Sequence, residues 1–248
     1  MLKEERFQQI INQLNLNHKV YLDQLSNLLK VSVDTIRRDI KELDLQGKLK
    51  AVRGGAIAHS SNPHNFIDRL DYDSEAKKSM AKKAIPLFHN GQTVIFDGGT
   101  STLAIANMLP DDLHLTVATN SFPVVTILKE RKNINVLFAG GQLFSEAFVT
   151  VGYDTITFFK DLRADLCFLG ICSLHAQHGV TAPNYEESKV KKVMTESSLQ
   201  TVALATPQKL DTAEPYLVCT ADKISTIITS NHDDKKLTPF HKLGIEVL

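Results

Sequence analysis

Two glycines and three hydroxyl residues follow an apolar run in the middle of the chain. Val94-Ile95-Phe96 leads into Asp97-Gly98-Gly99-Thr100-Ser101-Thr102, where a helical pattern begins. Glycines let a backbone approach a ligand closely, and hydroxyls at a helix N-terminus donate hydrogen bonds to an anion. The loop has neither the third glycine of G-x-G-x-x-G nor a Walker A Gly-Lys-Ser/Thr, which favours a small phosphate over a nucleotide. A plain N-capping turn is the structural alternative.

Small and polar residues also follow the next three apolar runs. Thr119-Asn120-Ser121 comes after the second run, Gly140-Gly141 after the third and Gly170 after the fourth. The carboxyl ends of parallel strands lie at one edge of a sheet, where α/β proteins bind their ligands. Because small and polar residues recur after these strands, the sequence predicts one polar binding site at the carboxyl edge of the sheet.

Other residues could support metal or acid–base chemistry. Cys172, His175 and His178 are of zinc-ligand type, but no fourth ligand is evident and ordinary surface histidines explain them as well. Asp97 and Glu187 are the candidate acid and base of an enzyme. The sequence contains neither G-x-S-x-G nor H-E-x-x-H. We therefore expect no metal and no cofactor.

Beyond residue 74, apolar runs alternate with helical patterns. The expected strands are Thr93–Phe96, Leu115–Ala118, Val136–Ala139, Leu166–Gly170, Thr201–Ala205, Thr226–Ile228 and Ile245–Leu248. The expected helices are Glu75–His89, Thr102–Leu109, Phe122–Arg131, Asp154–Leu162 and Glu187–Leu199. Strand and helix in alternation predict an α/β domain with a mainly parallel sheet.

The first sixty residues contain three amphipathic helical patterns. Apolar stripes with i, i+3, i+4 spacing run through residues 7–14, 22–29 and 33–43. Ser32 suits the N-cap of the third helix, and Gly47 can end that helix in a left-handed conformation. Two short helices, a tight turn and a third helix predict a helix-turn-helix whose third helix enters the major groove of DNA.

A short basic hairpin is expected directly after the third helix. Gly47 and Gly54-Gly55 bracket Lys48–Arg53, which predicts a wing on flanking phosphates or the minor groove. A helical hairpin without a nucleic-acid ligand is the alternative. Arginine can read guanine or clamp a phosphate. The candidate DNA-binding residues are Ser32, Thr35, Arg37, Arg38 and Lys41 on or near the third helix, and Lys48, Lys50 and Arg53 in the wing.

Length and charge agree with a two-domain arrangement. The 248 residues carry 28 Lys and Arg against 28 Asp and Glu, which excludes a uniformly basic nucleic-acid binder. Residues 1–60 hold 10 basic against 7 acidic residues, so the N-terminal module is the basic one. Three Cys, no long apolar run and a charged start predict a reduced, cytoplasmic protein without a membrane span.

The N-terminal region resembles DeoR-family bacterial transcription regulators. Val31–Leu49 contains Val-Ser-Val-Asp-Thr-Ile-Arg-Arg-Asp-Ile, and Arg53-Gly-Gly-Ala56 follows it. These segments are similar to the family pattern V-S-x-x-T-[IV]-R-R-D-[LI] and its wing ending in G-G-A, almost without gaps over residues 1–56. Ala51 stands where the family often has a basic residue, which removes one phosphate contact.

The resemblance extends into the larger region. Glu75–Leu109 looks like the start of the family's sensor domain, and Asp165–Gly170 and Glu187 with Lys191 match in order. The resemblance implies a domain similar to ribose-5-phosphate isomerase that binds phosphorylated sugars. The effector-binding residues it implies are Lys77, Asp97, Gly99, Thr100, Ser101, Thr102, Asn120, Lys191 and Lys209.

One departure bears on the effector. The family usually reads A-D-x-[ST]-K-F near the fifth strand, whereas this chain has Ala205-Thr206-Pro207-Gln208-Lys209-Leu210. Thr206 thus replaces an aspartate, although Lys209 is kept. The replacement leaves three functions open: a regulator with its usual kind of effector, a DNA binder whose sensor no longer binds a ligand, and a sugar-phosphate isomerase-like enzyme with an added DNA-binding domain.

The sequence as a whole predicts a regulator of transcription and not an enzyme. We expect a repressor of a carbohydrate operon that binds double-stranded operator DNA, responds to a phosphorylated sugar and forms a homo-oligomer, either a dimer or a tetramer. The expected domains are a winged helix-turn-helix over residues 1–56, a linker over 57–74 and an effector-sensing and oligomerisation domain over 75–248.

Overall fold

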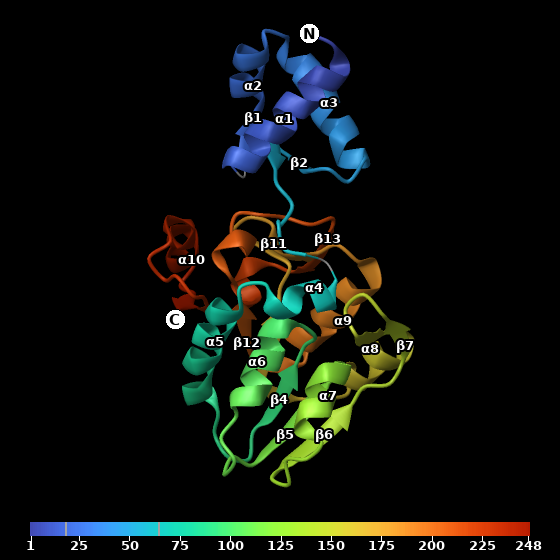
Figure 1. Ribbon diagram of the computed structural model, residues 1–248, viewed down its shortest axis with the longest axis vertical. Helices are drawn as coiled ribbons and strands as arrows, with labels where there is room; N and C mark the ends of the chain where they lie inside the picture. The colour runs from blue at the N-terminus through green and yellow to red at the C-terminus, as the bar shows by residue number, and fades with distance from the viewer. Residues whose placement is uncertain (18, 64) are drawn as a thin grey trace.

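The computed structural model describes residues 1–17, 19–63 and 65–248. Figure 1 shows a small helical body at the N-terminus, in blue, joined by one stretch of chain to a larger body built around a sheet. Within the described ranges, no helix is both long and apolar enough to cross a membrane.

The N-terminal body is a winged helix-turn-helix, as the sequence predicts. Its elements are α1 (Lys3–Asn17), β1 (Lys19–Tyr21), α2 (Leu22–Leu29), α3 (Val33–Leu45), β2 (Lys50–Val52) and β3 (Gly55–Ile57). The wing strands β2 and β3 pair antiparallel, and β1 adds a third strand on the other side of β3. The sequence does not predict β1, because three residues are too few to show an alternating pattern.

The turns around α3 form for local reasons. Lys30 ends α2 in a left-handed conformation with φ 55°, a role more often taken by glycine. The Ser32 hydroxyl then caps α3 by accepting a hydrogen bond from the Thr35 amide at 3.2 Å. Gly47 takes φ 67° after the helix, as expected. The apolar stripes of the three helices form one buried core with Leu49 of the wing.

A buried ion pair fixes α1 against α3. Arg6 donates to both carboxylate oxygens of Asp39, at 2.7 Å and 3.0 Å, and the two side chains are 13% and 5% exposed. This two-pronged geometry sets the relative orientation of the helices as well as their separation. Helical periodicity alone does not reveal the pair, since Asp39 lies on the flank of the apolar stripe.

The larger body centres on a seven-stranded parallel sheet, which confirms the expected α/β fold. Its order is β15-β14-β12-β9-β4-β5-β6, and all six neighbouring pairs are parallel. All seven expected strands are members of this sheet. Their bounds are β4 (Thr93–Phe96), β5 (Leu115–Thr119), β6 (Ile134–Phe138), β9 (Ala164–Gly170), β12 (Ser198–Leu204), β14 (Thr226–Ile228) and β15 (Glu246–Val247).

Helices cover both faces of the sheet, because successive strand residues point to opposite faces. In β9, Leu166 and Phe168 face one core and Cys167 and Leu169 face the other. One face is covered by α5 (Ser74–Ala84), α6 (Thr100–Met108) and α7 (Phe122–Leu128), and the other by α8 (Tyr153–Lys160), α9 (Tyr185–Glu196) and α10 (Thr238–Lys242).

Several expected helices end earlier than predicted. The pattern over Glu75–His89 divides into α5 and a 3-10 turn at Ile85–Leu87, because Pro86 has no amide hydrogen for a continued helix. The expected Glu187–Leu199 helix is also too long at its C-terminus. It ends at Glu196, and β12 begins at Ser198.

Short antiparallel elements are gathered at the carboxyl edge of the sheet. They follow β6, β9 and β12 in the chain, and the alternating pattern does not predict them because each has three or four residues. They are β7 (Gln142–Phe144) with β8 (Val149–Val151), and β10 (Ser173–His175) with β11 (Gly179–Ala182) and β13 (Tyr216–Cys219). In Figure 1, β11 and β13 lie with α4 (Phe66–Asp71) on the side facing the winged helix.

The connection between the two bodies is attached to the larger one. The Ala58 carbonyl accepts a hydrogen bond from the Ala213 amide at 3.2 Å, and the Phe66 amide donates to the Glu146 carbonyl at 2.7 Å. Helix α4 follows, with Asn65 as its N-cap. The limits 1–56, 57–74 and 75–248 remain our proposal for the domains, with residues 57–74 as the connection.

Candidate functional site

The turn after β4 is built so that backbone atoms come close together. Gly99 has φ 139°, a conformation that favours glycine. A Cβ on Gly98 would collide with the Val149 side chain. The Thr102 hydroxyl donates to the Gly99 carbonyl at 2.8 Å, so Thr102 stabilises the turn itself. The turn is therefore partly a capping turn, the alternative reading of the sequence, while Thr100 and Ser101 are left to face a cavity.

A buried ion network lies directly behind this turn. The Lys191 ammonium is paired with the Asp97 carboxylate, donates to the Gly170 carbonyl at 2.7 Å and lies 3.2 Å from a Glu187 oxygen. The Gly170 amide donates to Asp97 at 2.9 Å. The network thus ties the ends of β4 and β9 to α9.

The charge state of this network follows from its geometry. Burial alone lowers the pKa of Lys191, but the carboxylates of Asp97 and Glu187 outweigh burial and raise its pKa, so it stays an ammonium. Gly170 is required at the centre, because a Cβ there would collide with the Gly98 carbonyl. The ion network and the close approach of Gly170 to Gly98 together form the base of the cavity described next, which we call its floor.

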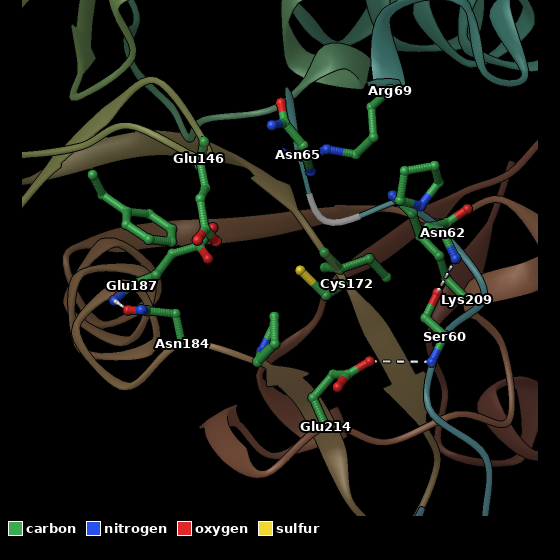
Figure 2. Close-up of a pocket in the computed structure, with 15 residues that line it drawn as sticks. Ser60, Asn62, Asn65, Arg69, Glu146, Cys172, Asn184, Glu187, Lys209 and Glu214 are labelled. Carbon is green, nitrogen blue, oxygen red and sulfur yellow. Dashed lines mark hydrogen bonds between the residues drawn. The ribbon is translucent and has the colours of Figure 1, made fainter. Parts of the chain in front are cut away.

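Two adjoining chambers open at the carboxyl edge of the sheet. The narrow chamber lies over the β4 turn and is lined by Gly98, Gly99, Thr100, Ser101, Gly170, Thr206, Lys77 and Lys209 together with residues of the connection and α4. The wide chamber, of about 530 Å³, extends toward Cys172, Asn184, Glu187 and Glu146. Asn62, Arg69, Ile171 and Lys209 line both, so the chambers form one continuous site. Figure 2 shows residues of the wide chamber.

Positive charge is concentrated around the narrow chamber. Arg69, Lys77 and Lys209 line it, against the single carboxylate of Asp73. Burial and the nearby charges of Arg69, Lys191 and Lys77 lower the pKa of Lys209 to about 8, although Cys172 acts in the opposite sense. Lys209 forms no ion pair with a residue in the described part of the chain. Such a site favours an anion.

The expected effector residues divide into two groups. Lys77, Gly99, Thr100, Ser101 and Lys209 line the cavity. The others lie behind its wall and are engaged within the protein: Asp97 with Lys191, Thr102 with Gly99, and the Asn120 amide with the Thr150 carbonyl at 2.7 Å. Lys77 is also engaged, since it donates to the Arg69 and Leu70 carbonyls at the end of α4. Contact of any of them with a ligand remains a prediction.

Thr206, the departure from the family pattern, lies in the narrow chamber. The residue is 2% exposed, and its hydroxyl has no hydrogen-bond partner among the described residues. An unpaired buried hydroxyl is costly, and a polar ligand would satisfy it. The replacement of an acid by a neutral hydroxyl also makes the chamber less repulsive to a phosphate.

The alternative chemistries find less support in the geometry. The ring centroids of His175 and His178 lie 4.7 Å apart with the rings tilted by 40°, while Cys172 faces the wide chamber. No cluster of three or more metal-ligating side chains occurs within residues 1–17, 19–63 and 65–248. Asp97, one of the two candidate catalytic carboxylates, is held by Lys191 and does not line either chamber.

The candidate DNA-binding residues form an exposed face of the winged helix. Ser32, Arg37, Arg38, Lys41, Lys48 and Arg53 are exposed, and Thr35 and Lys50 are half-buried. Asp34 organises the arginines: its carboxylate pairs with Arg37, and its carbonyl accepts from Arg38 Nε at 3.3 Å. Both guanidinium groups are held near the N-terminal half of α3, the part that enters the major groove in helix-turn-helix proteins.

A winged helix joined to an α/β domain with a cationic cavity at its strand ends defines a two-domain transcription regulator. The sequence profile of the DeoR-like helix-turn-helix domain matches residues 6–62, and that of the DeoR C terminal sensor domain matches residues 72–231. The chain belongs to the DeoR family. The resemblance seen in the sequence is thereby confirmed.

Similar proteins span nearly the full chain. The HTH-type transcriptional regulator GolR of Listeria innocua is 33% identical, covering 100% of this chain and 98% of its own length. The HTH-type transcriptional repressor GlcR of Bacillus subtilis is 31% identical, covering 100% of this chain and 96% of its own length. Among solved structures, ribose 5-phosphate isomerase A of Methanocaldococcus jannaschii matches with a TM-score of 0.41 and 13% identity. The match covers 55% of this chain and 54% of the isomerase chain. GolR and GlcR are named as transcriptional regulators. The structural similarity to the isomerase says nothing about the activity of this chain.

The buried ion network gives a first prediction. Lys191→Met leaves the Asp97 and Glu187 carboxylates buried without their cation, so the larger domain should lose about 3–5 kcal/mol of unfolding free energy. Urea unfolding followed by circular dichroism measures the loss. The deficit should shrink at acid pH, because a proton on one carboxyl relieves the repulsion.

The neighbouring lysine provides the control. Lys192 is 51% exposed and lies 3.8 Å from Glu196, so Lys192→Met should change stability by less than about 0.5 kcal/mol. Equal losses in the two variants would contradict a special role for the buried network.

Proposed function

We propose that this chain represses a carbohydrate operon and that a phosphorylated sugar in the cavity controls its binding to operator DNA. The observation that carries the proposal is the cationic narrow chamber over the Gly98–Ser101 turn, at the N-terminus of α6. In this site Lys209 and the hydroxyls of Thr100 and Ser101 bind the phosphate, and the wide chamber accommodates the sugar. GlcR is named a transcriptional repressor, and another relative is a putative aga operon repressor of Escherichia coli.

The polarity of the wide chamber supports a sugar as the neutral part of the ligand. Asn184, Glu187 and Glu146 line it, and these side chains can hydrogen-bond to hydroxyl groups. Asn184 is also the N-cap of α9, accepting from the Glu187 amide at 2.9 Å, which fixes its position. The ligand therefore spans from the β4 turn to the start of α9.

DNA recognition is assigned to the exposed face of α3 and to the wing. Arg37 and Arg38 contact bases or phosphates in the major groove, with Ser32, Thr35 and Lys41 beside them. Lys48, Lys50 and Arg53 contact the backbone, which makes affinity strongly salt-dependent. We further propose a homo-oligomer, a dimer or a tetramer, because symmetric regulators bind repeated or palindromic half-sites.

The effector assignment is tested by a thermal-shift comparison of sugar phosphates with the unphosphorylated sugars. A ligand at 100 times its dissociation constant should stabilise the chain by about 2.7 kcal/mol. Thr100→Asp should abolish the phosphate-dependent shift by charge repulsion. Stabilisation by the unphosphorylated sugars alone, or an unchanged shift in Thr100→Asp, would contradict the phosphate site. No shift with any compound would favour a DNA binder whose sensor has lost its ligand.

The effector affinity should also depend on pH. Lys209 is charged below its pKa of about 8 and neutral above it, so affinity for a phosphate should fall as the pH rises through that value. Phosphate monoesters are already dianionic there, so the fall reports on the protein. Calorimetric titrations of the wild type and Lys209→Met at several pH values measure this dependence. A pH profile shared by both proteins would rule out Lys209 as its origin.

Base recognition is tested at Arg38. Arg38→Ala should cost about 1–3 kcal/mol of discrimination between a duplex selected by the wild type and a scrambled one, as measured by fluorescence anisotropy. Lys48→Ala serves as the control, because loss of a phosphate contact should weaken both duplexes alike and reduce the salt slope by about one. Unchanged preference in Arg38→Ala would refute its role in base readout.

A further inference from the structure

The connection between the two domains forms one wall of the cavity. Ser60, Asn62 and Asn65 line the wide chamber, and Arg69 of α4 lines both chambers. In Figure 2, Arg69 and Asn65 enter from one side, Glu187 of α9 and its N-cap Asn184 lie on another, and the chain carrying Ser60 and Asn62 closes a third. The segment that leads to the winged helix is therefore within reach of a ligand in the cavity.

Polar atoms without partners gather on this wall. Asn62 Nδ2, Arg69 Nε and Asp73 Oδ2 are buried and have no hydrogen-bond partner among the described residues. All three residues line the narrow chamber, together with the unpaired Thr206 hydroxyl. Donors and acceptors left buried and unpaired in one place point to a polar ligand that pairs with them.

The wall is anchored to the larger domain near both of its ends. Glu214 anchors the first end, since it accepts from the Ser60 amide at 3.1 Å and lies 3.0 Å from His59 Nδ1. Lys77 holds the second end by donating to carbonyls at the end of α4. Ser60 is only three residues beyond β3 of the wing, so the first anchor lies close to the DNA-binding domain.

We propose that the connection is itself part of the effector site: Arg69 and Asn62 bind the ligand that Thr100 and Lys209 hold from the sheet side. This inference rests on the proposed function. Arg69 supplies a second cation to the phosphate, and Asn62 pairs with an adjacent oxygen. The ligand then bridges the sheet and the connection, and it fixes α4 against the narrow chamber.

Such a bridge would couple the effector to DNA binding. A ligand shifts a conformational equilibrium only through different affinities for its states. A ligand can contact Arg69 and Asn62 only when the connection lies over the cavity. These contacts therefore make its affinity for that arrangement higher than for one in which the connection has moved away. The bound ligand thereby restricts the positions that the winged helix can take relative to the larger domain, and a symmetric pair of winged helices can no longer adapt freely to its two half-sites.

The test uses the full chain with glucose 6-phosphate, fructose 6-phosphate, ribose 5-phosphate and inorganic phosphate as probes. Arg69→Gln is compared with Arg163→Gln, which removes the same charge from an exposed site just before β9, at the opposite end of the strand from the cavity. Affinity for the best probe should fall about tenfold to a hundredfold in Arg69→Gln and change by less than about twofold in Arg163→Gln.

Hydrogen exchange on the wild type gives a second readout that needs no variant. Saturation with the same probe should slow amide exchange across residues 66–72, and should slow it less in Arg69→Gln. Equal affinity in the two variants, or unchanged exchange over α4 in the saturated wild type, would overturn the proposal while leaving the proposed function intact. Failure of every probe to bind the wild type would instead overturn the proposed function, and this inference with it.

Discussion

A buried ammonium between two carboxylates holds the floor of the cavity together. Lys191 joins Asp97 at the end of β4 to Glu187 on α9 and also binds the Gly170 carbonyl at the end of β9. Three elements far apart in the chain thus meet at one cation. Its loss would leave unpaired charge in the interior, so the turn that faces the ligand depends on the network for its position. The residues that hold the site are consequently distinct from those exposed to a ligand.

The same separation of roles occurs in the winged helix. The Arg6–Asp39 pair is buried and orients α1 against α3, whereas Arg38 is exposed and free to reach DNA. Asp34, in the first turn of α3, positions the exposed arginines, since its carboxylate pairs with Arg37 and its carbonyl accepts from Arg38 Nε. In both domains, internal ion pairs fix the framework and charges at the surface or cavity wall remain available for anions. In the proposed function these cations meet DNA in one domain and the phosphate of a sugar in the other.

The connection gives the two domains a shared element. It is anchored on Glu214 beside the wide chamber, and it continues into α4, whose Arg69 faces both chambers. A passive linker would be expected to run over the surface with its polar groups in water. This one instead buries polar groups next to a cavity, which costs stability unless they are paired. That cost is the physical reason to assign the connection a part in ligand binding.

The sequence by itself determined the winged helix, the seven parallel strands and the Gly98–Ser101 turn, because periodicity, caps and glycines act over a few residues. It also contained Arg38 and Lys209 in recognisable motifs. Only the tertiary structure decided that Asp97 and Lys191 are paired behind the cavity wall, that Thr102 and Asn120 bond within the protein, and that Arg69 lies in the site. Ion pairing and burial depend on which segments distant in the sequence come into contact, and a local sequence pattern contains no information on those contacts.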